Sequence, residues 1–182
     1  GIIALSEGID ISTANTLEDY QPAFDTLQEQ VDSGQIRQFT GNEYVGPLED
    51  GTLAACFAWS GDVLGMNNPD IRYVVPDSGG TLWFDTMIIP KGASGAEDVA
   101  EWINFVYDPV NAAQITAAVQ FISPVQGVQE ELRKMGGDAA ALADSPYLFP
   151  DEATQERLHT FANLSDEEEA KMDEEFSTIS GA

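Results

Sequence analysis

The 182-residue sequence is poor in the residues that build metal centres and disulfide frameworks. Its single cysteine, Cys56, excludes an internal disulfide and a cysteine-rich zinc site. Its single histidine, His159, makes a histidine-based metal centre unexpected. We therefore expect no metal ion and no cofactor.

Basic residues are also scarce. Seven lysines and arginines stand against 32 aspartates and glutamates, which gives a formal net charge of −25. A field of this sign repels nucleic-acid phosphates and anionic membrane surfaces, so neither is an expected partner. Most of the acids are expected to form a solvated surface that keeps the protein soluble. A cationic ligand or partner remains compatible with this charge.

Long apolar runs and catalytic motifs are missing as well. No apolar stretch reaches the roughly 18 residues that a membrane-spanning helix needs. The sequence has no G-x-S-x-G elbow, no phosphate-binding glycine loop and no H-E-x-x-H motif, so we do not expect an enzyme. It begins with Gly1 rather than methionine, and we expect it to be a piece of a longer protein.

The chain nevertheless carries enough apolar residues, 43% of the total, for a packed core. Thr16 is expected to cap a helix that Gly34 ends, Pro109 to begin a helix that runs to about Val119, and Ser165 to begin a last helix. Apolar runs predict strands at residues 35–39, 53–59, 71–75 and 82–89. Because strands alternate with helices, the fold class predicted is α/β.

Two aromatic residues are candidates for a binding site. Trp59 ends the apolar run 53–59, which we expect to be a buried strand, and ligands of open α/β sheets collect at the carboxyl ends of strands. The alternative is that Trp59 caps the core. Phe121 lies in an extended segment after a helix, where it either lines a site or packs in the core.

A second candidate is the pair Trp83 and Asp85. Strand alternation would place both side chains on one face of the strand at 82–89. A carboxylate inside an apolar strand is costly unless it is matched by charge or by several donors. An indole beside it offers a surface for a cation. The pair therefore indicates recognition of an amine, unless Asp85 accepts backbone N–H groups at a bend.

Several sequence blocks, taken together and in order, resemble the spermidine/putrescine-binding proteins of polyamine ABC transporters, of the type II periplasmic-binding-protein class. The blocks cover residues 51–62, 71–76, 80–86, 89–93, 103–109, 121–124 and 148–151. The resemblance implies two α/β lobes with the ligand in the cleft between them. The chain would then form a lobe with a mixed sheet flanked by helices, together with an incomplete first lobe.

The resemblance also implies roles for single residues. Tryptophans at the positions of Trp59 and Trp83 pack on the methylene chain of a polyamine, and the acid at Asp85 pairs with an amine. Phe121 stands where the family has a tyrosine, which keeps the stacking surface and loses a hydroxyl. Asp62, in the turn after Trp59, completes the set of expected ligand-binding residues.

The implied domain organisation has three parts. Residues 1–83 and 131–182 would belong to the second lobe, and residues 84–130 would cross toward a first lobe that lies outside this chain. The implied function is an extracytoplasmic solute-binding component that binds a spermidine- or putrescine-like cation and delivers it to an ABC transporter permease. If this organisation holds, residues 84–130 taken alone should expose apolar surface.

Two other functions remain open at this point. The same fold would suit a different small solute, such as an amino acid, a metal chelate or a sugar-like compound. Alternatively, the acidic residues at 166–169 and 173–175 would form a protein-interaction domain that binds a basic partner, unless they only begin a helix, where acids favour the helix dipole.

Overall fold

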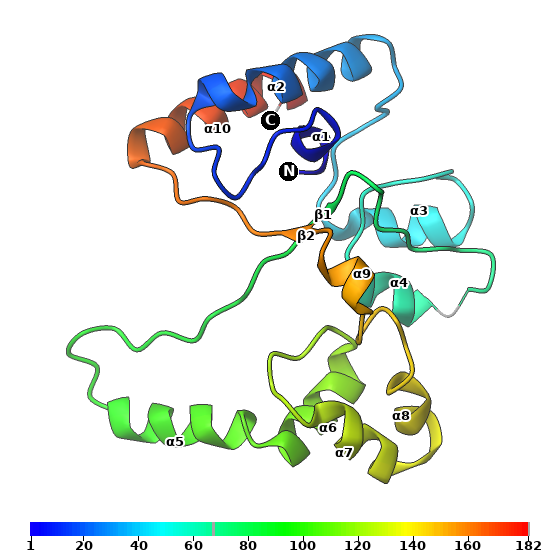
Figure 1. Cartoon of the computed structure of the whole chain (residues 1–182), viewed down its shortest axis with the longest axis vertical. Coiled ribbons are helices and arrows are strands. Elements are labelled where there is room, and N and C mark those ends of the chain that lie inside the picture. Colours follow the sequence, from blue (N-terminus) through cyan, green and yellow to red (C-terminus); the bar gives the residue numbers. More distant parts are fainter. Residues whose placement is uncertain (67, 182) are drawn as a thin grey trace. The chain divides into compact units, whose positions relative to one another are not determined.

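The structure of the chain is a computed structural model that describes residues 1–66 and 68–181. It divides into two compact units (Figure 1). The first unit comprises Gly1–Asn42, Val74–Phe84 and Ala153–Ala182, and the second unit comprises Glu43–Tyr73 and Asp85–Glu152. Helices dominate the described residues. They are α1 (Ile2–Ser6), α2 (Leu17–Asp32), the 3₁₀ helix η1 (Asn42–Tyr44), α3 (Val45–Glu49), α4 (Ser60–Met66), α5 (Ala96–Val106), α6 (Pro109–Val119), α7 (Val128–Met135), α8 (Gly137–Leu142), α9 (Glu152–Gln155) and α10 (Asp166–Ser180).

The first unit packs α1 and α10 against α2 (Figure 1). Its buried cluster is formed by small and aliphatic side chains with one aromatic residue: Ala4, Leu5, Ile11, Ala14, Tyr20 and Ala23. Met172 brings α10 onto this cluster. A two-stranded parallel sheet joins distant parts of the unit, with β1 (Gly80–Thr81) paired to β2 (Leu158–His159). The Arg157 guanidinium adds a hydrogen bond of 3.1 Å to the Val75 carbonyl.

Local sequence signals explain where α2 and α10 begin. Thr16 accepts a hydrogen bond from the Asp19 amide, and the Asp19 carboxylate accepts one from the Thr16 amide, which completes a capping box. Ser165 caps α10 by accepting from the Glu168 amide. The Glu168 carboxylate accepts from the Leu17 amide at 2.7 Å and from Lys171 at 2.7 Å, so the α10 terminus also holds the start of α2.

The second unit contains two buried clusters. One lies between α6, α7 and α8 and is built from Ala112, Ala113, Val128, Leu132 and Ala143. The other is built from Tyr44, Val63 and Met66, with α3 and the segment around Ile71 and Tyr73 packed against it. This second cluster connects η1 and α3 to α4, and it positions the residues discussed below.

The predicted helices are confirmed, and the predicted strands are wrong. Residues 35–39, 53–59, 71–75 and 82–89 form no strand, and pairing in the described chain is confined to Gly80–Thr81 and Leu158–His159. A strand needs a neighbour for its backbone N–H and C=O groups. The run 53–59 pairs with no strand within the described residues, and Phe57 and Cys56 are exposed rather than buried. The expected mixed sheet is therefore not present in the described part of the chain.

No helix among the described residues has the length and apolar character needed to cross a membrane. The division into residues 1–83, 84–130 and 131–182 stays a prediction. Residues 84–130 do expose large apolar side chains, as expected. These include Phe84, Met87, Ile88, Trp102, Phe105, Tyr107, Val110 and Val119.

The Thr16→Ala substitution should destabilise the first unit. It removes the hydroxyl that caps α2, which typically costs about 1 kcal/mol in the free energy of unfolding. Chemical denaturation followed by circular dichroism measures the loss. Thr40→Ala is the matched control, because Thr40 is exposed and lies outside the helices. Equal stability of the two variants would contradict the capping role.

Candidate functional site

A hydrogen-bonded junction holds the segment that leads into α4. The Tyr44 side chain is buried, with 4% of its surface exposed. Its hydroxyl donates to the Asp62 carboxylate at 2.5 Å and accepts from the Trp59 amide at 3.0 Å. One side chain from η1 therefore fixes both the backbone before α4 and a carboxylate in the first turn of α4.

Burial and the neighbouring carboxylate raise the pKa of Tyr44 to about 12, with burial the larger cause. The phenol therefore keeps its proton at physiological pH, and the hydroxyl remains a donor to Asp62. No ion pair of the described chain includes Asp62. The carboxylate charge is thus stabilised by a neutral phenol and left without a cationic partner among the described side chains.

Phe121 lies beside the start of α4. A Cβ atom at Gly61 would come within 2.5 Å of the Phe121 ring and 2.8 Å of the Gln120 carbonyl oxygen, so no other residue fits at Gly61 without displacement. Gln120 itself ends α6 in the left-handed conformation, at φ 60°. This tight approach places Phe121 against Gly61, the residue before Asp62, in the chain's second unit.

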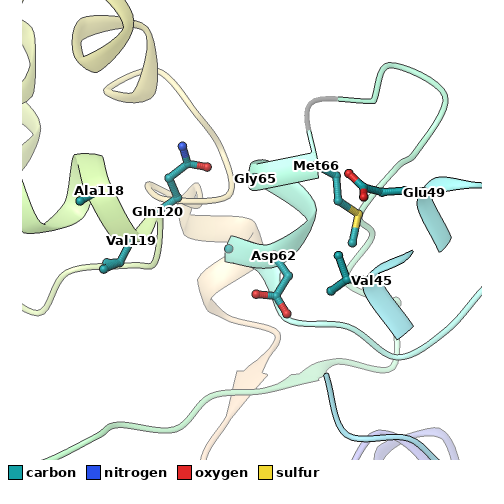
Figure 2. A pocket seen from close by; sticks show the side chains of 9 residues that line it. Val45, Glu49, Asp62, Gly65, Met66, Ala118, Val119 and Gln120 are labelled. Carbon is teal, nitrogen blue, oxygen red and sulfur yellow. The ribbon is translucent and has the colours of Figure 1, made fainter. Parts of the chain in front are cut away.

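A pocket of about 360 Å³ lies in the same place (Figure 2). Figure 2 shows Asp62 and Val45 from the α3–α4 side and Val119 and Gln120 from the end of α6. The lining combines two carboxylates with an amide and apolar groups: Val45, Glu49, Gly61, Asp62, Gly65, Met66, Ala118, Val119 and Gln120. Carboxylates without a basic neighbour in such a lining suit a cationic group.

Trp59 is 43% exposed, so its indole is partly open to solvent, and its role in ligand binding stays a prediction. Its position does not come from the end of a strand, as the sequence predicted, because residues 53–59 are irregular. Its place is set instead by the hydrogen bond from its amide to Tyr44. Within the second unit, Tyr44 thus links Trp59 to Asp62, and Phe121 lies against the neighbouring Gly61.

Trp83 and Asp85 do not share a strand face, because residues 82–89 are irregular. Trp83 follows β1 in the first unit and is 45% exposed, while Asp85 begins the next segment of the second unit. Asp85 is exposed rather than buried, and within residues 1–66 and 68–181 its carboxylate accepts no backbone N–H. The backbone-bonded alternative for Asp85 is therefore wrong, and its role in ligand binding stays a prediction.

No local motif marks Tyr44, Glu49 or Gln120 as site residues. The two hydrogen-bond partners of Tyr44 lie 15 and 18 positions away in the chain. The described residues contain no group of three or more side chains suited to hold a metal ion.

Comparison with known proteins places the chain among solute-binding proteins. The family "Bacterial extracellular solute-binding protein" matches residues 11–153. The putrescine-binding periplasmic protein SpuD of Pseudomonas aeruginosa is 25% identical over 159 residues, which cover 79% of this chain and 40% of SpuD. The putrescine-binding periplasmic protein PotF of Escherichia coli is 22% identical over 133 residues, which cover 69% of this chain and 34% of PotF.

A spermidine/putrescine-binding periplasmic protein of Escherichia coli is 25% identical over 121 residues, covering 65% of this chain and 33% of that protein. The chain thus spans between a third and two fifths of the length of these curated relatives. The resemblance seen in the sequence is confirmed, and the family is one of transport proteins rather than a class of enzymes. The chain belongs to the bacterial extracellular solute-binding protein family.

Proposed function

We propose that the chain is part of an extracytoplasmic solute-binding protein that captures a polyamine, such as putrescine or spermidine, for an ABC transporter. The observation that carries the proposal is the Asp62 carboxylate, which has a hydrogen-bond donor but no cation beside it in the described chain. Trp59 presents a half-exposed indole in the same unit. The relatives named for putrescine and spermidine support this choice of ligand.

The ligand would be held by two kinds of contact. Carboxylates at Asp62 and Asp85 would pair with ammonium groups, each contact contributing about 1.5–3 kcal/mol. The indoles of Trp59 and Trp83 and the ring of Phe121 would cover the methylene chain, and each contact of a cation with an aromatic face would add about 0.5–2 kcal/mol. The protein binds and releases its ligand in this proposal and catalyses no reaction.

The complete protein would close two lobes around the ligand and then dock on a permease outside the cytoplasm. Residues 1–83 and 131–182 would belong to the second lobe, and residues 84–130 would pack on the first lobe. The exposed apolar side chains of α5 support this assignment, since Trp102 and Phe105 stack at 5.9 Å without any buried residue on the helix. The relatives' names, which call them periplasmic, support the location.

The two rival functions have less support. A bound amino acid or metal chelate would bring a carboxylate of its own toward Asp62 and Glu49, which repel it. A basic protein partner at α10 is disfavoured because two of the acids have structural roles. Glu167 and Glu168 pair with Lys171, and Glu168 also holds the Leu17 amide.

The Asp85→Asn substitution tests the charge contact in the natural full-length protein. Losing one charge-assisted contact should raise the dissociation constant for putrescine about 10- to 100-fold, as measured by isothermal titration calorimetry. Asp70→Asn is the matched control, because Asp70 is exposed and lies outside the proposed site. An unchanged dissociation constant for Asp85→Asn would remove Asp85 from the site.

The three tryptophans provide a second test with an internal control. Trp59→Ala and Trp83→Ala should each weaken putrescine binding about threefold to thirtyfold, because each removes an aromatic face from the ligand. Trp102→Ala should leave the affinity unchanged, since Trp102 stacks on Phe105 in α5. Equal effects of all three substitutions in fluorescence titrations would speak against aromatic contacts at Trp59 and Trp83.

A further inference from the structure

We infer that Tyr44 is a positioning residue of the ligand site, where its hydroxyl orients the Asp62 carboxylate and fixes the backbone at Trp59. The inference rests on the proposed function, because it assigns Tyr44 a role in binding the same cationic ligand. Tyr44 itself makes no contact with the ligand in this account. It acts through Asp62 and Trp59.

The geometry at the Tyr44 hydroxyl uses both of its hydrogen-bonding capacities. The O–H group donates to Oδ2 of Asp62 at 2.5 Å. The oxygen accepts from the Trp59 amide at 3.0 Å. A hydroxyl has one proton to donate, so the acceptance from Trp59 leaves that proton directed at Asp62.

This arrangement leaves the second carboxylate oxygen of Asp62 for a ligand. Oδ1 accepts no hydrogen bond within the part of the chain that the structure describes. With Oδ2 held by a buried donor, rotation of the carboxylate is restricted before the ligand arrives. A preorganised acceptor loses less side-chain freedom on binding, and this increases affinity.

The ring and the hydroxyl of Tyr44 have separable roles. The ring packs with Val63 and Met66 in the buried cluster, and a phenylalanine would preserve that packing. The hydroxyl alone makes the two polar contacts. Tyr44→Phe therefore removes the positioning hydrogen bonds while leaving the apolar cluster in place.

Isothermal titration of the natural full-length protein with putrescine tests the inference. Tyr44→Phe should raise the dissociation constant about tenfold, the usual effect of losing one hydrogen bond to a charged group. Tyr73→Phe is the matched control. Tyr73 lies in the same unit and packs edge-to-face on Tyr147 at 5.7 Å, and its hydroxyl makes no hydrogen bond within the described residues. The control should bind putrescine like the wild type.

A double-mutant cycle separates positioning from a general loss of stability. In an Asp62→Ala background, Tyr44→Phe should change the dissociation constant by clearly less than tenfold, because only the contact with the Trp59 amide remains to be lost. A full tenfold effect in that background would overturn the inference. So would equal binding by the wild type and Tyr44→Phe.

Hydrogen exchange of the Trp59 amide gives a readout that needs no ligand. The Tyr44→Phe variant should exchange this amide at least tenfold faster than the wild type and than Tyr73→Phe, because its acceptor is removed. An unchanged exchange rate of the Trp59 amide in Tyr44→Phe would overturn the positioning role of Tyr44 and leave the proposed function standing. Protection of the amide in a wild-type protein that binds neither putrescine nor spermidine would instead overturn the proposed function, and with it the ligand role of Tyr44.

Discussion

The geometry of the proposed ligand residues of the second unit depends on the hydrogen bonds of the Tyr44 hydroxyl. It bridges η1 to the segment entering α4, and it does so from within an apolar cluster of Val63 and Met66. The cluster excludes water from the phenol, so the hydrogen bond to Asp62 faces little competition from solvent. Burial also raises the pKa of Tyr44 to about 12, so the phenol remains a donor well above physiological pH. Trp59 and Asp62 are thereby placed by one side chain, although they belong to an irregular segment and a short helix.

In the proposed function, the charge of the chain would make this placement selective for a cation. The described ion pairs occupy four of the seven basic residues, namely Arg133, Lys134, Arg157 and Lys171, and none of them reaches Asp62 or Asp85. A carboxylate in that situation attracts a cation from outside the chain and repels an anion. Aromatic faces close to such a carboxylate add affinity for a cation that carries an apolar chain. A diamine combines these two features, and the relatives named for putrescine and spermidine agree with that chemistry.

The sequence predicted the helices well because their signals are local. The Thr16 capping box and the Asp108–Pro109 start of α6 each lie within a few residues of the structure that they specify. The strand predictions were wrong because an apolar run such as 53–59 indicates burial without identifying a neighbouring strand. Strand pairing depends on residues far away in the chain. Among the expected site residues, Trp59 and Asp62 both bond to the Tyr44 hydroxyl, and Phe121 lies against Gly61, while their role in ligand binding stays a prediction. Tyr44 escaped notice because its importance arises only from contacts across 15 and 18 positions.

In the proposed function, the site recognises positive charge rather than shape alone. The most direct measurement compares two ligands of equal length in the natural full-length protein, putrescine and the neutral butane-1,4-diol, by isothermal titration calorimetry. The charge-based account predicts measurable binding of putrescine, weakened by added salt, and at least 100-fold weaker binding of the diol. Similar affinities for the diamine and the diol would contradict it.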